Sequence, residues 1–121
     1  MVSFSELQVY QLSEKVANKI WFIVQDWQYF EKDTIGKQLV RAADSVGANI
    51  AEGNGRYNAK DNQRFVRIAK GSLNEIRHWL RLAYSRNLLT SEQINQIRPL
   101  IDELSPKLSA YLNSLKATNN K

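Results

Sequence analysis

The sequence contains no cysteine, which excludes disulfide bonds and thiolate metal ligands. It has one histidine, His78, so no pair of imidazoles is available for a metal site or a catalytic dyad. Its longest apolar run, Ile20–Val24, is far shorter than the roughly 20 residues of a membrane-spanning helix. The N-terminus lacks the basic and apolar segments of a signal peptide. These absences predict a cytoplasmic protein with no membrane partner and no cofactor.

Glycine and proline are also scarce, at five and two residues among 121, and apolar residues recur every three or four positions. Capping boxes are predicted at Ser3-x-x-Glu6 and Thr90-x-x-Gln93, and single caps at Asp33 or Thr34 and at Asn58. These signals predict helices over about 4–29, 34–53, 59–87 and 91–116. Because the connections are short, we expect an all-α, antiparallel up-down four-helix bundle. We expect one domain over 1–121, with a frayed tail from about 117.

Two apolar stripes run along the first predicted helix. The core stripe consists of Val9, Leu12, Val16, Ile20, Ile23, Trp27 and Phe30. The second stripe, roughly 100° around the helix, consists of Tyr10, Ala17, Trp21 and Val24. Either the last helix partly covers the second stripe, or that stripe is an oligomer interface, because aromatic residues concentrate at interfaces. We predict the interface.

The second and fourth predicted helices show different packing patterns. The second has an apolar face made of Ile35, Leu39, Ala42, Val46 and Ile50. Beside it runs a row of small residues that lets a neighbouring backbone approach closely: Gly36, Val40, Ala43, Gly47 and Ala51. The fourth repeats apolar residues from Ile94 to Leu115 at the spacing of knobs-into-holes packing. Pro99 and Pro106 fall inside it, and we expect a kink or a break, above all at Pro106.

The net charge of +5 is concentrated in the third predicted helix, where residues 58–90 hold seven basic and two acidic residues. Six of the basic residues form a band within roughly 140° of arc, which we call the basic band: Lys60, Arg64, Arg67, Lys70, Arg77 and Arg81. The opposite side is apolar and consists of Phe65, Ala69, Leu73, Ile76, Leu80 and Ala83. Exposed faces usually mix charges, so a band of one sign predicts binding to nucleic-acid phosphates through counterion release. Arg41 and Arg56 extend the set of candidate nucleic-acid-binding residues.

Few exposed aromatic residues accompany the basic band, so base stacking and sequence readout are not expected. The alternative is a protein–protein scaffold whose basic face binds an acidic protein partner. No set of residues supports catalysis, because Ser45 and Ser72 lack a histidine base nearby in the sequence. Asp102 and Glu103 are adjacent, so their carboxylates point in different directions around a helix. The sequence therefore predicts a protein that is not an enzyme.

The stretch Asn49–Lys60 contains a G-x-G that could be mistaken for a phosphate-binding loop. A dinucleotide fingerprint needs a preceding strand and a third glycine, whereas here a helix precedes the motif and Asn58 occupies the third position. Glycine directly after a helix is typical of a left-handed C-cap. We therefore interpret Gly53, Gly55 and Asn58 as the corner between the second and third helices.

Three stretches resemble a known family: V-Y-Q-L-S-E-K-V (Val9–Val16), Q-L-V-R-A-A-D-S-V-G-A-N-I-A-E-G-N-G-R (Gln38–Arg56) and R-F-V-R-I-A-K-G-S-L-N-E-I (Arg64–Ile76). They are similar to the four-helix-bundle proteins encoded in intervening sequences of bacterial 23S rRNA genes, and the resemblance covers residues 6–115. The positions that match the family motif are Arg41, Asn49, Glu52, Gly53, Gly55, Arg56, Gly71, Ser72 and Glu75.

The same family includes the accessory variability determinant of diversity-generating retroelements. The resemblance therefore implies a homopentamer with a basic surface, nucleic acid and a reverse transcriptase as partners, and no enzymatic activity. The sequence departs from the family pattern before the second helix, where Phe30–Asp33 contains no proline. Pro99 and Pro106 are also atypical.

Overall fold

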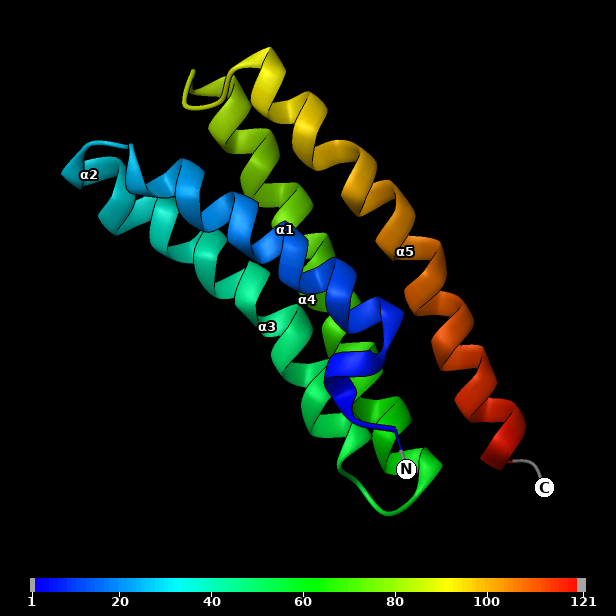
Figure 1. Cartoon of the computed structure of the whole chain (residues 1–121). Helices are drawn as coiled ribbons and strands as arrows, with labels where there is room; N and C mark the ends of the chain where they lie inside the picture. Colours follow the sequence, from blue (N-terminus) through cyan, green and yellow to red (C-terminus); the bar gives the residue numbers. More distant parts are fainter. Residues whose placement is uncertain (1, 120–121) are drawn as a thin grey trace.

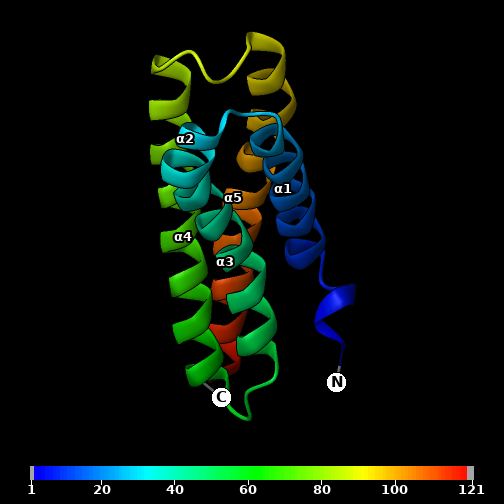
Figure 2. The same ribbon diagram turned by 90° about the vertical axis from the view of Figure 1, so that its left-hand side faces the viewer.

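The computed structural model describes residues 2–119, with side chains through residue 117, and places four long helices side by side (Figure 1). The elements in chain order are η1 (Phe4–Glu6), α1 (Gln8–Gln25), α2 (Tyr29–Glu31), η2 (Lys32–Gly36), α3 (Lys37–Asn54), α4 (Ala59–Ser85) and α5 (Ser91–Asn119). Each long helix packs against two others, in the cyclic order α1, α3, α4, α5. Figure 2 shows α3 in front, with α4 and α1 on either side of it. The predicted all-α four-helix bundle is confirmed.

One apolar core runs along the bundle and receives side chains from every long helix. Its most deeply buried large members are Val16, Ile20, Leu39, Val46, Ile50, Val66, Ile76, Ile97, Leu104 and Leu108. Full burial of each such side chain contributes about 1.5–3 kcal/mol. All five residues of the apolar face predicted for the second helix are buried, with Ile35 in η2 and the other four in α3. Helical periodicity therefore located this face of the core correctly.

The first helix is shorter than predicted at both ends. Leu7 is extended, with ψ of 130°, and separates the short turn η1 from α1. The Glu6 carboxylate accepts a hydrogen bond from the Ser3 N–H at 3.3 Å, so this pair caps η1 rather than α1. At the other end α1 stops at Gln25, and Phe30 is therefore 73% exposed instead of lying in the core.

The start of the second long helix also differs from the prediction. Neither Asp33 nor Thr34 is a cap, because both lie within η2, a π-helical turn that leads directly into α3. The Thr34 hydroxyl donates to the carbonyl of Phe30 at 2.7 Å, and Asp33 pairs with Lys37 at 3.3 Å. The turn brings Gly36 against α1, where an added Cβ would lie 2.8 Å from Val24 Cγ1.

The last helix begins as predicted but does not break. Thr90 and Gln93 form a reciprocal capping box, with hydrogen bonds of 2.9 and 3.1 Å. α5 then continues through Pro99 and Pro106 to Asn119. Both prolines are exposed, so water can reach the carbonyl groups that lose their helical partners. The break expected at Pro106 is therefore wrong, and helix continues past residue 117. Residues 120–121 of the predicted frayed tail lie outside the described part of the chain.

Candidate nucleic-acid interface

The buried side of α4 fixes which residues it turns outward. Ala69, Leu73, Ile76, Leu80 and Ala83 of the predicted apolar stripe are buried, and Phe65 is half-buried. The basic band consequently faces away from the core. All of its members are exposed except Lys70, which is half-buried.

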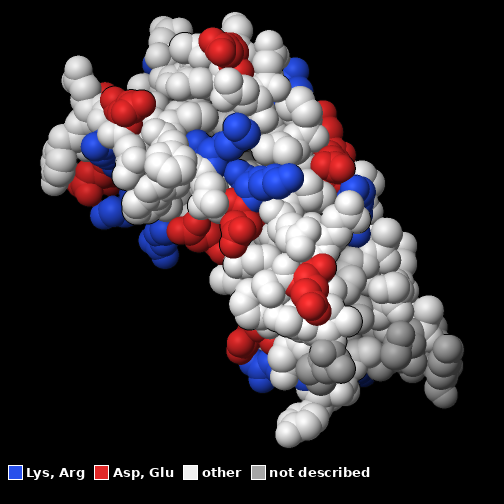
Figure 3. All heavy atoms as spheres, in the orientation of Figure 1, with Lys and Arg blue, Asp and Glu red and all other residues white. Residues whose placement is uncertain are grey.

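Charge is distributed differently on the other side of the molecule. Figures 1 and 2 place α4 behind α1 in the first view, so Figure 3 shows the face away from α4. On that face, positive and negative side chains are interspersed and separated by uncharged surface. In contrast, α4 carries the six residues of the basic band and only two acidic residues, Asp61 and Glu75. The excess positive charge is therefore a property of the α4 side.

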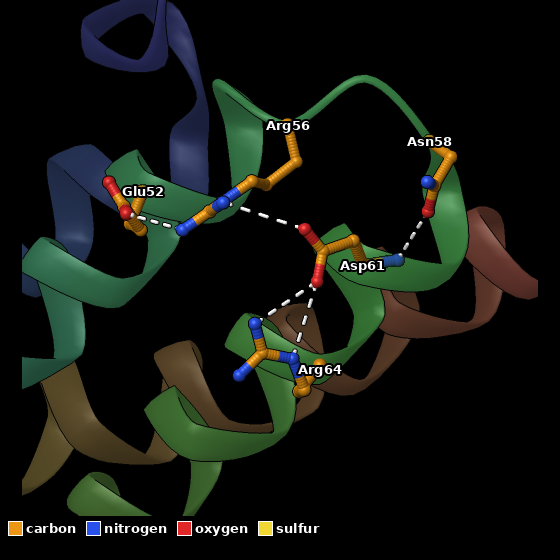
Figure 4. A network of polar contacts seen from close by, with 5 residues as sticks. All are labelled: Glu52, Arg56, Asn58, Asp61 and Arg64. Carbon is orange, nitrogen blue, oxygen red and sulfur yellow. Dashed lines mark hydrogen bonds and ion pairs between the residues drawn. The ribbon is translucent and has the colours of Figure 1, made fainter.

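A network of polar contacts neutralises part of this charge at the start of α4 (Figure 4). The Asn58 side chain accepts a hydrogen bond from the Asp61 N–H at 2.7 Å, which confirms Asn58 as the N-cap. The Asp61 carboxylate pairs with Arg64 at 3.1 Å and with Arg56 at 3.6 Å. Arg56 also contacts Glu52 at 2.7 Å. Two basic side chains thus share two carboxylates.

The same two arginines also contact an aromatic ring. The guanidinium carbons of Arg56 and Arg64 lie 4.7 and 4.5 Å from the centroid of Phe65, within the range of cation–π attraction. Both residues are predicted to contact phosphate, and in the structure both pair with carboxylates. The other members of the basic band have no ion pair within residues 2–117: Lys60, Arg67, Lys70, Arg77 and Arg81. These five are the free cations of α4.

The corner between α3 and α4 is built differently from the prediction. α3 continues through Gly53 to Asn54, and Gly55 has a right-handed φ of −83°. No glycine in the described chain has a positive φ, so the left-handed C-cap interpretation is wrong. Gly53 is required for space, because an added Cβ would lie 2.9 Å from Phe65 Cβ and would collide with the Asn62 side chain. The glycine lets α3 and α4 approach closely.

Two residues of the family motif, Asn49 and Ser72, meet Ser45 further along the contact between α3 and α4. The hydroxyls of Ser45 and Ser72 lie 2.9 Å apart and share a hydrogen bond. The Asn49 amide donates to the Ser45 hydroxyl at 3.0 Å and to the Ser45 carbonyl at 2.8 Å. This cluster joins the two helices and gives the motif a structural role.

Arg41 lies away from the basic band. It lines a groove of about 540 Å³ between α3 and α4, together with the carboxylates of Asp44 and Glu75. Partial burial raises the pKa of Asp44 above its ordinary value. Since two acidic side chains share this groove, Arg41 is a poorer candidate for phosphate than the free cations of α4.

A larger groove, of about 860 Å³, lies between the second half of α4 and the first half of α5. Arg77 and Arg81 line it from α4, and Arg98 lines it from α5. Tyr84, 53% exposed, also lines it. Sequence reasoning missed Arg98 and Tyr84 as site residues. Tyr84 had a detectable signal, because it follows Arg77 and Arg81 by seven and three positions on the same side of the helix.

The four residues of the predicted oligomer interface differ in burial, so they do not form one exposed stripe. Val24 is only 7% exposed and belongs to the core, so it does not lie on a surface stripe. Ala17 and Tyr10 are half-buried, and the Tyr10 ring lies against Gly47 and, edge to face, against Phe4. Trp21 remains 47% exposed.

Shortly after Trp21 in the chain, large aromatic residues at the end of α1 and in α2 are also exposed: Phe22, Tyr29 and Phe30. We call these three residues and Trp21 the aromatic patch. The patch is a stronger interface candidate than the predicted stripe, because all four of its members are exposed.

Two further findings concern other classes of site. Among the described residues, no group of three or more His, Asp or Glu side chains could hold a metal ion. His78 lines the α4–α5 groove and packs edge to face on Trp79, with 4.7 Å between ring centroids.

No helix in the described part of the chain is long and apolar enough to cross a membrane.

Comparisons with known proteins place these features in a family. The model of the 23S rRNA-intervening sequence protein family matches residues 5–110. A crystal structure from Bacteroides thetaiotaomicron VPI-5482, described as a protein of unknown function from the S23 ribosomal protein family, is 26% identical with a TM-score of 0.76. The match covers 86% of this chain and 97% of that one. The search of curated proteins found no match. The resemblance seen in the motifs is confirmed: the chain belongs to the 23S rRNA-intervening sequence protein family.

Proposed function

We propose that this chain is a non-enzymatic, homo-oligomeric protein that binds RNA or DNA through phosphates. The observation that carries the proposal is the set of free cations on α4, which all project from one helix without an ion pair inside the described chain. Cations that are already exposed and unpaired can contact phosphate without breaking another interaction. Arg56 and Arg64 are secondary, because a phosphate would have to compete with Glu52 and Asp61 for them.

Phosphate binding has a quantitative signature. Each neutralised phosphate releases condensed counterions, so the logarithm of the binding constant falls linearly with the logarithm of salt concentration. If all five free cations contact phosphate, the slope is about −4.5 on a duplex and about −3.5 on a single strand. Arg67→Ala removes one such contact and reduces the slope by about 0.7 to 0.9, with equal weakening for all nucleic-acid sequences.

The test is fluorescence anisotropy with labelled RNA and DNA at several salt concentrations. Lys37→Ala is the matched control, because it removes a charge from α3 that already pairs with Asp33. We expect Lys37→Ala to bind like the wild type. Salt-independent binding, or no binding at low salt, would refute the proposal.

An acidic protein is the competing class of partner. If it were the true ligand, polyglutamate would displace nucleic acid efficiently at equal charge concentration. We expect weak displacement, because nucleic acid carries its charges more densely, about one per 1.7 Å of a duplex against about one per 3.3–3.6 Å of extended polyglutamate, and releases more condensed counterions. Strong displacement would favour a protein–protein scaffold instead.

Self-association is the second part of the proposal. The exposed side chains of the aromatic patch support it, since aromatic residues are enriched at protein interfaces. The family resemblance implies five copies and an accessory role beside a reverse transcriptase. Light scattering of the purified protein tests the copy number, and co-purification with a tagged reverse transcriptase encoded nearby tests the partner.

A further inference from the structure

We propose that the α4–α5 groove binds a single strand of nucleic acid, with phosphates on Arg77, Arg81 and Arg98 and a base against Tyr84. The inference rests on the proposed function and deepens it, because it specifies the class of nucleic acid. It predicts a preference for single strands over duplexes.

The charge of the groove comes from both of its walls. Arg77 and Arg81 project from α4 and Arg98 projects from α5, and among the described residues Asp102 is the one carboxylate that lines the same space. The side chains of these three arginines make no ion pair or hydrogen bond within residues 2–117. A strand lying between the helices can meet guanidinium groups on two sides. The bases of a duplex are paired and stacked inside it, so a duplex would offer only its phosphates to the groove.

The lining of the groove also includes apolar residues, of which Ile94 is half-buried and the others belong to the core. Leu80, Ile94, Ile97 and Ile101 line the groove, and Tyr84 stands among the arginines with 53% of its surface exposed. Unpaired bases stack on exposed aromatic rings, and this interaction is tolerant of sequence. In a duplex the bases are already stacked on one another. The tyrosine therefore distinguishes single strands from duplexes.

The basic band continues beyond the groove, which favours a strand over an acidic helix of a partner protein. Lys70 and Arg67 precede Arg77 on the outer side of α4 and are free cations. They extend the positive path along a helix that rises about 1.5 Å per residue. A nucleic-acid strand can follow that path out of the groove. A peptide helix bound between α4 and α5 would leave these charges without a partner.

The experiment measures anisotropy of a labelled oligothymidylate of about 16 nucleotides and of a duplex of the same length, at one salt concentration. We expect the wild type to bind the single strand about tenfold more tightly. Tyr84→Ala should weaken single-strand binding about tenfold and change duplex binding less than twofold. Tyr84→Phe keeps the ring and should retain single-strand affinity. Arg98→Ala should weaken the single strand selectively, whereas Arg67→Ala should weaken both forms equally.

Circular dichroism and light scattering of each variant complete the test. If both nucleic acids bind equally with a steep salt dependence, and Tyr84→Ala has no effect, the groove proposal is wrong while the proposed function stands. If neither binds at low salt, both are wrong. If Tyr84→Ala or Arg98→Ala changes the oligomeric mass, the groove is an interface between copies and the proposal is overturned. Displacement of the single strand by polyglutamate at equal charge would also overturn it.

Discussion

The hydroxyl groups of Ser45 on α3 and Ser72 on α4 lie 2.9 Å apart at the contact between their helices. Ser72 is 7% exposed and Ser45 is half-buried, so removal of the Ser72 hydroxyl takes a partly buried hydrogen bond away from Ser45. We expect Ser72→Ala to lower the free energy of unfolding by about 1 kcal/mol. Ser72→Leu should cost about 1–3 kcal/mol, because the larger side chain would force the helices apart.

Urea unfolding measures both variants, and an unchanged m-value indicates that the denatured state is unaffected. Ser85→Ala is the matched control, since the exposed Ser85 hydroxyl bonds only to the carbonyl of Leu82 in its own helix. The control should lie within about 0.5 kcal/mol of the wild type. Equal losses for Ser72→Ala and Ser85→Ala would show that the interhelical bond contributes nothing specific.

Gly53 and Gly71 should respond in opposite ways to the same substitution. An added Cβ at Gly53 would lie 2.9 Å from Phe65 Cβ, whereas at Gly71 nothing lies within 4 Å. Gly53→Ala should therefore destabilise the fold by about 1–3 kcal/mol. Gly71→Ala should stabilise it by about 0.5–1 kcal/mol, because alanine replaces glycine inside an exposed helix turn. Thermal or urea unfolding of the two variants side by side decides the matter.

The bundle could be predicted from sequence because it depends on local periodicity. Leu39, Val46 and Ile50 repeat at the helical period, and no alternative element fits that spacing. The misplaced residues depend on contacts between distant segments. Phe30 fits the stripe of the first helix, but that helix ends early, where the Trp27 indole donates a hydrogen bond to the carbonyl of Leu88 at 3.0 Å. The spacing of residues in the sequence does not reveal such a contact.

The candidate site was predictable only in part, for the same reason. The outward direction of Arg67 follows from the apolar stripe opposite it. The pairing of Arg56 with Asp61 depends on how the corner between α3 and α4 folds back, and spacing alone does not determine this. Arg98 joins Arg77 at one groove because of the register between α4 and α5. That register is set by the packing of the whole core.

Asp61 restrains two arginines, and its neutralisation should strengthen nucleic-acid binding. Asp61→Asn removes the charge that pairs with Arg56 and Arg64 while keeping the size of the side chain. We expect affinity at low salt to rise about three- to tenfold and the salt slope to steepen by about one to two units, as these arginines reach phosphate. The variant loses a favourable charge at a helix N-terminus, so it should be less stable by about 0.3–1 kcal/mol. If the affinity is unchanged, the expectation is wrong. These arginines then either contact phosphate in the wild type already or do not contact it in the variant.

The carboxyl group of Asp44 should make stability depend on pH. Desolvation raises its pKa in the folded protein, so folding favours the protonated form. The resulting stabilisation is fully present below the unfolded-state pKa of about 3.9 and is lost as the pH rises through the folded pKa. Much of the side chain is exposed, so the effect is small. Asp44→Asn should thus be more stable than the wild type at pH 7 and equal to it near pH 3.5, as measured by urea unfolding. An equal gain at both pH values would point to packing instead of ionisation.

Trp21 offers the cleanest test of self-association. Its side chain is 47% exposed and belongs to the aromatic patch, so a charge there should disrupt an interface without damaging the core. We expect Trp21→Asp to reduce the mass measured by light scattering toward the 14.0 kDa of one chain. Tyr10→Asp is a poorer test, because the half-buried ring packs on Gly47 and its loss would also destabilise the bundle. Tyr57→Asp is the control, since Tyr57 is fully exposed at the α3–α4 corner, outside the aromatic patch. A wild type that is monomeric at micromolar concentration, or a Trp21→Asp variant that keeps the wild-type mass, would show that the patch does not hold copies together.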